Sequence, residues 1–259
     1  MPTISCVICA YNEADRLGDL LRVVAVHPAL DQVIVVDDGS TDATAQILAR
    51  FPSVEAVSLP QNRGKTFAMG IGAARSFGDH VLFLDADLAG LSAGDIHRLV
   101  APVLSGACAV TLGMRGNSLG LYRALGLDFI TGERVVPGWL ARGQPEIWER
   151  LPRWGAEVFL NSLVVSAELP VAVVDCPNVR NVRKAEKVGA LAGLWAELKM
   201  IRDIAEVLTP AGLVMQVARL RTLSRGRRPG WDLAWPSWNF GGDRPGRPVP
   251  LLAGNRRRS

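Results

Sequence analysis

The sequence predicts an α/β fold whose sheet is doubly wound and mostly parallel, with helices on both faces. Three observations support this class. Short apolar segments alternate with amphipathic ones, the apolar segments carry few polar residues, and several of them end in a polar cluster. Strands that are apolar throughout are typical of parallel sheets, which are covered on both faces. The chain has 259 residues, enough for one large domain or two small ones.

The first two strand and helix units are read from apolar periodicity. Residues 4–8 form an apolar run, and the apolar positions that begin at Leu17 recur at helical spacing. Residues 33–36 form a second buried strand, after which Ser40 or Thr41 is expected to cap a helix that runs to Phe51. Polar residues 11–13 and 37–42 follow the two strands directly.

The later elements continue the alternation, with one irregular stretch that reaches Pro137. The expected strands are 54–59, 81–84, 107–112 and 171–175, and the expected helices are 66–75, 95–104, 156–169 and a long amphipathic helix over 191–208. Pro210 ends the last of these helices. In doubly wound sheets, ligands bind at the carboxyl ends of the strands, so the polar clusters there are the candidate site.

Charge divides the chain in two. Residues 211–259 hold ten arginines against Asp232 and Asp243, which is +8, and the total of +4 leaves −4 for residues 1–210. We therefore expect a domain over 1–210, with halves 1–115 and 116–210, followed by a basic tail over 211–259 that is rich in Trp, Arg and Pro.

Cysteine usage and hydropathy indicate a cytoplasmic chain. Four scattered cysteines are too few for a disulfide framework, which favours a reducing compartment. The apolar start is interrupted by charged residues from Glu13 onward, so no secretory signal is predicted. The longest uncharged stretch, residues 99–114, is shorter than the roughly 18 to 20 residues that span a bilayer.

Two acidic pairs, Asp85 with Asp87 and Asp37 with Asp38, and one lysine could carry chemistry. Asp85 and Asp87 follow a very apolar strand, and paired carboxylates suit Mg²⁺ or Mn²⁺, although acids also cap turns in this position. Asp38 ends the second strand, where a carboxylate can bind a base or ribose or can favour a helix dipole. Lys65, beside a helix start, is either a diphosphate ligand or an exposed loop lysine.

Three other classes are disfavoured. Gly64-Lys65-Thr66 lacks the glycine that a phosphate-binding loop needs five residues earlier, where Leu59 stands. Gly70 and Gly72 lie inside a predicted helix, which excludes a dinucleotide fingerprint. Cys6 and Cys9 have metal-site spacing, but in a strand they point to opposite faces and no second pair follows.

Four segments in order resemble the family-2 glycosyltransferases with the GT-A fold, over residues 1 to about 115: Ile8-Cys9-Ala10-Tyr11-Asn12-Glu13, Val35-Val36-Asp37-Asp38-Gly39-Ser40-Thr41-Asp42, Asn62-Arg63-Gly64-Lys65 and Phe83-Leu84-Asp85-Ala86-Asp87. The resemblance implies a nucleotide-sugar donor and a divalent metal. It assigns Ala10, Tyr11 and Glu13 to the nucleoside pocket, and it assigns Asp38 to the base. It places Lys65 near the diphosphate or ribose, Asp85 on ribose or metal, and Asp87 on the metal.

The second half is similar to polyprenyl-phosphate sugar synthases. Residues 128–134 match their Asp-x-x-Ser/Thr-Gly-x-Arg segment, and residues 113–115 match the Gly-x-Arg before it, although the segment between the two is shorter here. Residues 154–157 resemble a helix start that presents a carboxylate to the acceptor, so Glu157 is the candidate catalytic base, with Glu133 and Asp128 as runners-up.

Residues 178–189 resemble the stretch that closes the site, where some relatives carry a metal-binding histidine. Asn181 stands in that place here, and Arg180, Arg183 and Lys187 can face a diphosphate, an anionic acceptor or solvent.

The predicted function is inverting, metal-dependent transfer of a sugar from a nucleotide-diphosphate sugar to an unidentified acceptor, with polyprenyl phosphate or another lipid as a candidate. A sugar-phosphate nucleotidyltransferase is the alternative enzyme, although residues 9–16 lack the Gly-rich loop it needs. A non-catalytic nucleotide-sugar-binding protein is the third hypothesis. Nucleic acid is not an expected partner. The tail has an apolar stripe over 213–220. It is expected either to hold the chain on an anionic membrane surface, or to be a disordered solvated tail or one that packs over the body of the protein.

Overall fold

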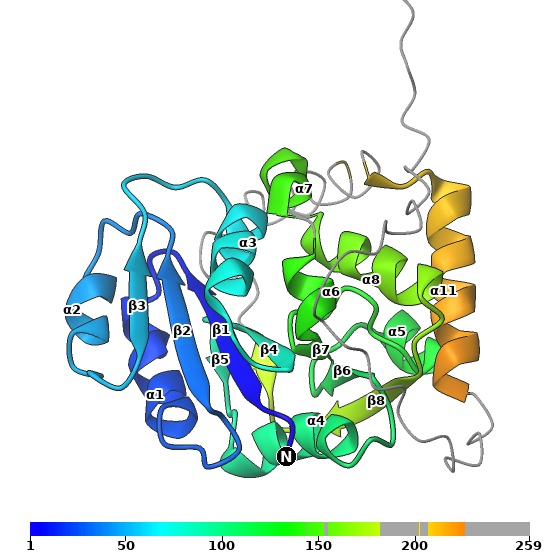
Figure 1. Cartoon of the computed structure of the whole chain (residues 1–259), viewed down its shortest axis with the longest axis horizontal. Coiled ribbons are helices and arrows are strands. Elements are labelled where there is room, and N and C mark those ends of the chain that lie inside the picture. Colours follow the sequence, from blue (N-terminus) through cyan, green and yellow to red (C-terminus); the bar gives the residue numbers. More distant parts are fainter. Residues whose placement is uncertain (144, 153–154, 182–201, 203–206, 226–259) are drawn as a thin grey trace, which may run out of the picture.

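The computed structural model describes residues 1–143, 145–152, 155–181, 202 and 207–225. The strands in these ranges are β1 (Ile4–Ala10), β2 (Gln32–Asp37), β3 (Glu55–Ser58), β4 (His80–Asp85), β5 (Leu88–Ala89), β6 (Val110–Arg115), β7 (Arg134–Pro137), β8 (Val171–Cys176) and β9 (Arg180–Asn181). Seven of them form one sheet in the order β3-β2-β1-β4-β7-β6-β8, and β5 pairs with β9 (Figure 1).

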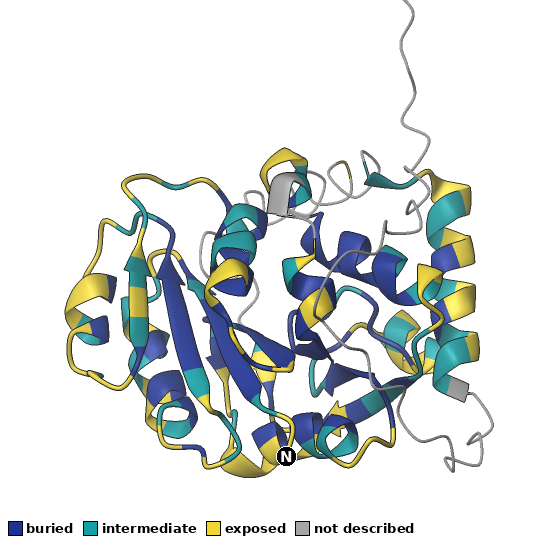
Figure 2. Ribbon diagram, in the orientation of Figure 1, coloured by how far each residue is buried: buried dark blue, intermediate teal, exposed yellow. Residues whose placement is uncertain are grey.

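The helices cover both faces of the sheet, as predicted. They are α1 (Ala14–Val24), α2 (Thr44–Leu48), α3 (Lys65–Arg75), α4 (Ala93–Leu104), α5 (Gly120–Leu125), α6 (Gly138–Arg142), α7 (Pro145–Arg150), α8 (Ala156–Ser166) and α11 (Pro210–Arg225). Side chains of α1, α2 and α4 build one hydrophobic core, and those of α3, α6, α8 and α11 build the other. Figure 2 shows the strands buried between these two layers.

The sheet is mostly parallel, but β7 runs antiparallel to both β4 and β6. The sequence predicted an irregular stretch from the end of the strand over 107–112 through Pro137, so β7 was missed. It has four residues, all buried, which is too short to show a period. Its position between β4 and β6 brings the preceding residues 128–133 to the carboxyl end of β4.

The predicted cap of α2 is wrong. The residue before α2 is Ala43, whose side chain makes no cap. Asp42 Oδ1 instead accepts a hydrogen bond from the backbone N–H of Thr44 at 2.9 Å. Ser40 Oγ and the backbone N–H of Thr41 instead form hydrogen bonds with Asn12, in the loop after β1. The helix ends at Leu48 rather than at Phe51.

Residues 210–225, assigned by sequence to the tail and to the end of the domain, form α11, which packs on α8. Leu220 is fully buried in the core that α8 also lines. Gln216 Nε2 donates to the carbonyl of Val158 at 3.0 Å and to Ser162 Oγ at 2.8 Å. The apolar stripe predicted over 213–220 therefore faces the body of the protein. Residues 226–259 of the tail and most of the helix predicted over 191–208 lie outside the described residues.

Within the described ranges, no helix is long and apolar enough to cross a bilayer. The uncharged stretch 99–114 is divided between α4 and β6.

Candidate active site

The predicted polar clusters meet at one edge of the sheet. β1 pairs in parallel with β2 and with β4, so that Ala10 lies opposite Asp37 and Cys9 lies opposite Asp85. Parallel strands in register end together, and their following loops are neighbours. The loops after β1, β2 and β4 therefore share the carboxyl edge, where α3 also begins.

The loops after β1 and β2 are joined through Asn12. Its backbone has φ 55°, a left-handed conformation that asparagine tolerates. The side-chain oxygen of Asn12 accepts a hydrogen bond from the backbone N–H of Thr41 at 2.8 Å. The backbone N–H of Asn12 donates to Ser40 Oγ at 2.9 Å. Beside it, Tyr11 is exposed and Glu13 is half-buried. Ala10 is buried and contacts this region through its carbonyl, which accepts from Asp38 N–H at 2.8 Å.

Asp38 holds the loop that leads into α3. Its Oδ1 accepts from the backbone N–H of Arg63, and its Oδ2 from that of Gly64, both at 2.7 Å. Gly64 has φ 96°, which a residue with a side chain would adopt only under strain. Asp38 is 3% exposed. The structure thus gives Asp38 a loop-clamping role, and its contact with a base stays a prediction.

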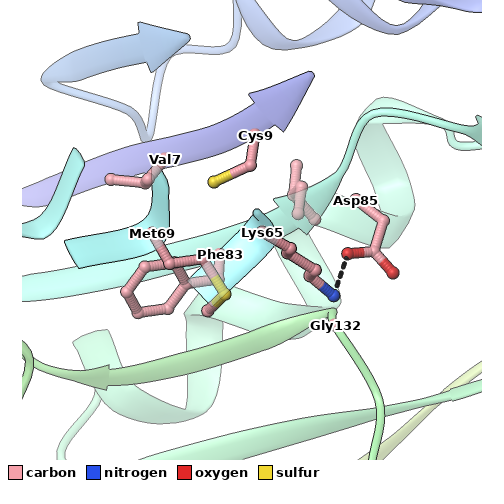
Figure 3. A pocket seen from close by; sticks show the side chains of 8 residues that line it. Val7, Cys9, Lys65, Met69, Phe83, Asp85 and Gly132 are labelled. Atoms are coloured by element: carbon pink, nitrogen blue, oxygen red, sulfur yellow. Dashed lines mark ion pairs between the residues drawn. The ribbon is translucent and has the colours of Figure 1, made fainter. Parts of the chain in front are cut away.

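Lys65, the first residue of α3, joins two acids from distant parts of the chain. Its Nζ lies 2.7 Å from Asp85 Oδ1, as Figure 3 shows, and 2.7 Å from Glu157 Oε1. Burial alone would lower the pKa of Lys65, but the two carboxylates raise it. Burial likewise would raise the pKa of Asp85, but Lys65 and Arg115 hold it below its usual range. Both groups are therefore charged at neutral pH.

A packed apolar cluster lies beside the Lys65 and Asp85 pair. Val7, Met69 and Phe83 lie to one side of the pair in Figure 3, and the small hollow among them has no room for a water molecule. The backbone of Gly132 also approaches the pair, and a Cβ there would stand 2.3 Å from Asp85 Oδ1. Only glycine allows this approach, so the loop before β7 sits directly against the Asp85 carboxylate.

Arg115, at the end of β6, lies among three acids. Its guanidinium nitrogens are 3.8 Å from Asp85 Oδ2, 3.6 Å from Asp128 Oδ2 and 3.5 Å from Glu133 Oε2. Asp128 and Glu133 are each 1% exposed. Burial raises the pKa of Glu133, and the charge of Arg115 offsets only part of that rise. Thr131 Oγ1 donates a hydrogen bond to Glu133 Oε2 at 2.6 Å. The two runners-up for the base are thus more deeply buried than Glu157, which is 5% exposed.

The sequence did not single out Arg134 and Asn161 as separate site residues. Together they connect the loop before β7 with helix α8. Arg134 Nη1 donates to Asn161 Oδ1 at 3.0 Å and to the carbonyl of Glu157 at 3.3 Å, while its Nε donates to the carbonyl of Thr131 at 3.0 Å. Asn161 Nδ2 donates to the carbonyl of Phe129 at 2.7 Å. The sequence signal for Arg134 was its place at the end of the motif over residues 128–134.

Asn181 lies beside the acidic pair, where the resemblance placed it. β9 pairs with β5, the strand that follows Asp87, and Asn181 Nδ2 donates to Asp85 Oδ2 at 3.4 Å. Asn117 holds the backbone of Asn181 from the loop after β6. Arg183, Lys187 and Trp154, which the sequence also singled out, lie outside the described residues.

Comparison with known proteins agrees with this geometry. Residues 5–127 match the model of the family described as Glycosyl transferase family 2. The match covers just under half of the chain, and we call residues 5–127 the family-2 segment. It contains the polar clusters after β1, β2 and β4 together with Lys65, so the predicted resemblance is confirmed over these residues.

Relatives of this family-2 segment carry the names of several glycosyltransferases. The chain is 40% identical over 125 residues to undecaprenyl-phosphate 4-deoxy-4-formamido-L-arabinose transferase of Pseudomonas fluorescens, over 44% of this chain and 36% of the relative. It is 32% identical over 114 residues to glucosyl-3-phosphoglycerate synthase of Mycolicibacterium paratuberculosis, over 40% and 34% of the two chains. The chain thus spans about a third of the length of these relatives.

Solved structures extend the likeness beyond the family-2 segment. Glucosyl-3-phosphoglycerate synthase of Mycobacterium tuberculosis, solved with Mn²⁺, UDP and glucosyl-3-phosphoglycerate, has a TM-score of 0.62 at 23% identity over 84% of this chain and 80% of that chain. The same enzyme with Mn²⁺, UDP-glucose and phosphoglyceric acid has a TM-score of 0.59. At this identity the likeness shows the fold, and it confirms the GT-A prediction.

The family-2 segment offers two carboxylates to a divalent cation, Asp85 and Asp87. In the described part of the chain, no three His, Cys, Asp or Glu side chains gather as a metal cluster. Such sites need no complete protein cage, because Mg²⁺ is often held by one or two carboxylates together with substrate phosphates. Asp85 faces Lys65, Arg115 and Asn181. Asp87 is half-buried and close enough to Arg115 to help raise the pKa of that guanidinium, so both carboxylates are candidates to hold the cation.

Proposed function

We propose that this chain transfers a sugar, with inversion, from a nucleotide-diphosphate sugar to an acceptor hydroxyl or phosphate. The observation that carries the proposal is the junction at Lys65, whose Nζ lies 2.7 Å from Asp85 and 2.7 Å from Glu157. This junction brings the family-2 segment and the second half of the chain together at one edge of the sheet. The names of the two relatives described above, a sugar transferase and a glucosyl synthase, support the same reaction class.

The donor is proposed to lie over the loops after β1 and β2. Tyr11 and Glu13 lie at the rim where a nucleoside can bind, and Asp38 holds the loop that delivers Lys65. The two phosphates of the donor bring negative charge to the helix start that carries Lys65, which favours their binding there. Mn²⁺ and a UDP-sugar occur together in the structural neighbour, and this supports a nucleotide sugar as the donor class.

A divalent metal, Mg²⁺ or Mn²⁺, is proposed to bind Asp87, with Asp85 beside it. When bound, it would offset negative charge on the departing nucleoside diphosphate. Asp85 contributes through a carboxylate that Lys65 and Arg115 keep ionised. Lys65 itself holds a positive charge near the same place, so the chain's own residues share the task of stabilising the leaving group.

Glu157 is the proposed general base when the acceptor is a hydroxyl. It lies in the first turn of α8, and Lys65 fixes its Oε1. Single displacement requires that a base on the acceptor side takes the hydroxyl proton as the bond to the leaving diphosphate breaks. An acceptor that is already a phosphate needs no base, and then Glu157 serves to hold Lys65.

A lipid-linked phosphate is the proposed acceptor class. The first relative described above acts, by its name, on undecaprenyl phosphate, and residues 113–115 and 128–134 resemble polyprenyl-phosphate sugar synthases. Arg115 lies where those two segments meet. We further propose that the chain is cytoplasmic and peripheral to the membrane, where such an acceptor is found.

The test is transfer from a panel of nucleotide sugars to polyprenyl phosphates and to soluble acceptors, with the anomeric configuration of the product read by NMR. We expect transfer that requires Mg²⁺ or Mn²⁺, a product of inverted configuration, and loss of transfer in EDTA and in Asp87→Ala. Retained configuration would refute single displacement. Release of pyrophosphate when the protein is given a nucleoside triphosphate and a sugar phosphate would favour the nucleotidyltransferase. Donor binding without turnover would favour a binding protein.

A further inference from the structure

Helix α11 has a second apolar face, which is exposed in the part of the chain that the structure describes. Its inner face packs on α8 through Leu213, Val217 and Leu220. On the outside, Val214 is 69% exposed and Met215 is 70% exposed. Figure 2 shows this outward side of α11 as exposed over successive turns.

The outer face continues along the helix at regular spacing. Its exposed residues are Ala211, Val214, Met215, Ala218, Arg219 and Thr222. Positions three and four apart lie on one side of an α-helix, so these residues form a single stripe. The stripe is apolar in its first half, and Arg219 follows directly after the apolar part.

Charge indicates what covers this stripe. The 16 residues of α11 contain three arginines and no acid, and Arg227 and Arg228 follow the helix in the sequence. A helix with an exposed apolar stripe and cationic residues beside it is suited to the interface of a bilayer that carries anionic lipids. A second copy of the chain fits less well, because the six exposed residues of the stripe are far fewer than the roughly 20 to 30 residues that each partner contributes to a stable interface.

We propose that the outer stripe of α11, residues 211–222, is a docking surface for an anionic lipid bilayer. Val214 and Met215 enter the region between headgroups and acyl chains, and Arg219 binds lipid phosphate. This differs from the sequence-based expectation, in which the stripe over 213–220 faced the membrane, because that side of the helix is buried on α8. The inference stands on the geometry of α11 and does not depend on the transfer reaction.

The experiment is co-sedimentation of the full chain with vesicles of phosphatidylglycerol and phosphatidylcholine in equal parts, and with vesicles of phosphatidylcholine alone. The test variant is Val214→Gln/Met215→Gln, which keeps residues of adequate helix propensity. Its matched control is Val26→Gln/Phe77→Gln, which replaces residues that are 78% and 61% exposed elsewhere on the surface. A third variant, Arg219→Glu, reverses one charge. Thermal unfolding checks that each variant is folded.

We expect the wild type and the control to bind the anionic vesicles and not the neutral ones. The association constant should fall roughly tenfold or more in Val214→Gln/Met215→Gln and in Arg219→Glu. Binding of the wild type should also weaken as salt rises from about 50 to about 500 mM.

Three results would overturn the proposal. The first is equal binding by wild type and Val214→Gln/Met215→Gln, and the second is no binding of the wild type to anionic vesicles at low salt. The third is a dimer, seen by analytical ultracentrifugation without lipid, that Val214→Gln/Met215→Gln abolishes, because a second copy would then cover the stripe.

Discussion

At the scale of single residues, Asp38 shows how one carboxylate can hold a loop and a ligand site together. Both of its oxygens accept backbone hydrogen bonds, from Arg63 and Gly64. These bonds place Lys65, the next residue, at the start of α3. Loss of the carboxylate should therefore affect both stability and the position of Lys65.

We expect Asp38→Ala to lower the free energy of unfolding by about 2 to 3 kcal/mol, because two buried N–H groups lose a charged acceptor. It should also weaken donor binding. Denaturant unfolding and calorimetry with the donor measure the two effects. Asp42→Ala removes a carboxylate that accepts from the backbone N–H groups of Ala14 and Thr44, at the starts of α1 and α2. Neither of these hydrogen bonds involves the loop that leads to Lys65, so the change should leave donor affinity nearly unchanged. Donor affinity equal to wild type in Asp38→Ala would remove Asp38 from the donor site.

Glu157 carries the chemistry proposed for the acceptor side. We expect Glu157→Gln to lower kcat by roughly 10² to 10⁴ with a hydroxyl acceptor, because the amide keeps the shape of the base and cannot take a proton. Donor binding should change little, since Lys65 keeps Asp85 as a partner. Steady-state kinetics and donor calorimetry separate the two. A variant with near wild-type kcat would show that Glu157 only holds Lys65.

At the scale of elements, α11 supports the helix that carries Glu157. Its inner face fills the core beside α8, and Gln216 donates to the Val158 carbonyl and to Ser162 Oγ. The helix therefore belongs to the folded domain, although the charge pattern assigned it to the tail. A chain ending at Pro210 would lack Leu220 and would expose the core that Leu220 covers, so it cannot serve as a simple test of the tail.

We expect Gln216→Ala to destabilise the domain by about 1 to 3 kcal/mol, through loss of two hydrogen bonds in a buried interface. The chain ending at Pro210 should lose cooperative unfolding or aggregate. Thr222→Ala, on the exposed side of α11, is the matched control and should stay within about 0.5 kcal/mol of wild type. Denaturant unfolding measures all three. If the shortened chain unfolds cooperatively with wild-type stability, then α11 is a separable tail.

At the scale of the whole molecule, the ion pairs of Lys65 connect α3, β4 and α8 across both halves of the chain. The pKa of Asp85 is lowered, so its contribution to stability is present above its unfolded value of about 3.9 and is lost as pH falls through the folded value. The pKa of Lys65 is raised, so its contribution is present below about 10.4 and is lost as pH rises through the folded value. The junction should be intact throughout the neutral range.

We therefore expect stability in EDTA to fall as pH drops below about 4, and to fall less steeply in Asp85→Asn than in wild type. Guanidinium unfolding at a series of pH values measures this. Identical pH profiles for the two proteins would show that Asp85 does not contribute through its charge. EDTA keeps metal binding out of the comparison.

The sequence by itself determined the alternating strands and helices of the donor half and the polar clusters that follow the strands. These features depend on local periodicity and on chain neighbours, which a single sequence displays directly. For that reason β1, β2 and β4 were predicted to within one or two residues at each end, and the carboxyl edge was identified as the site. The fold class followed from the same alternation.

Only the tertiary structure decided which distant residues meet. Lys65 and Glu157 are 92 positions apart, and no local pattern relates them. The antiparallel β7 places Gly132 against Asp85, and α11 turns one apolar face inward while leaving another outside. These outcomes depend on burial and on pairing between distant segments. The free energy gained by packing the whole chain outweighs the local conformational preference of each segment.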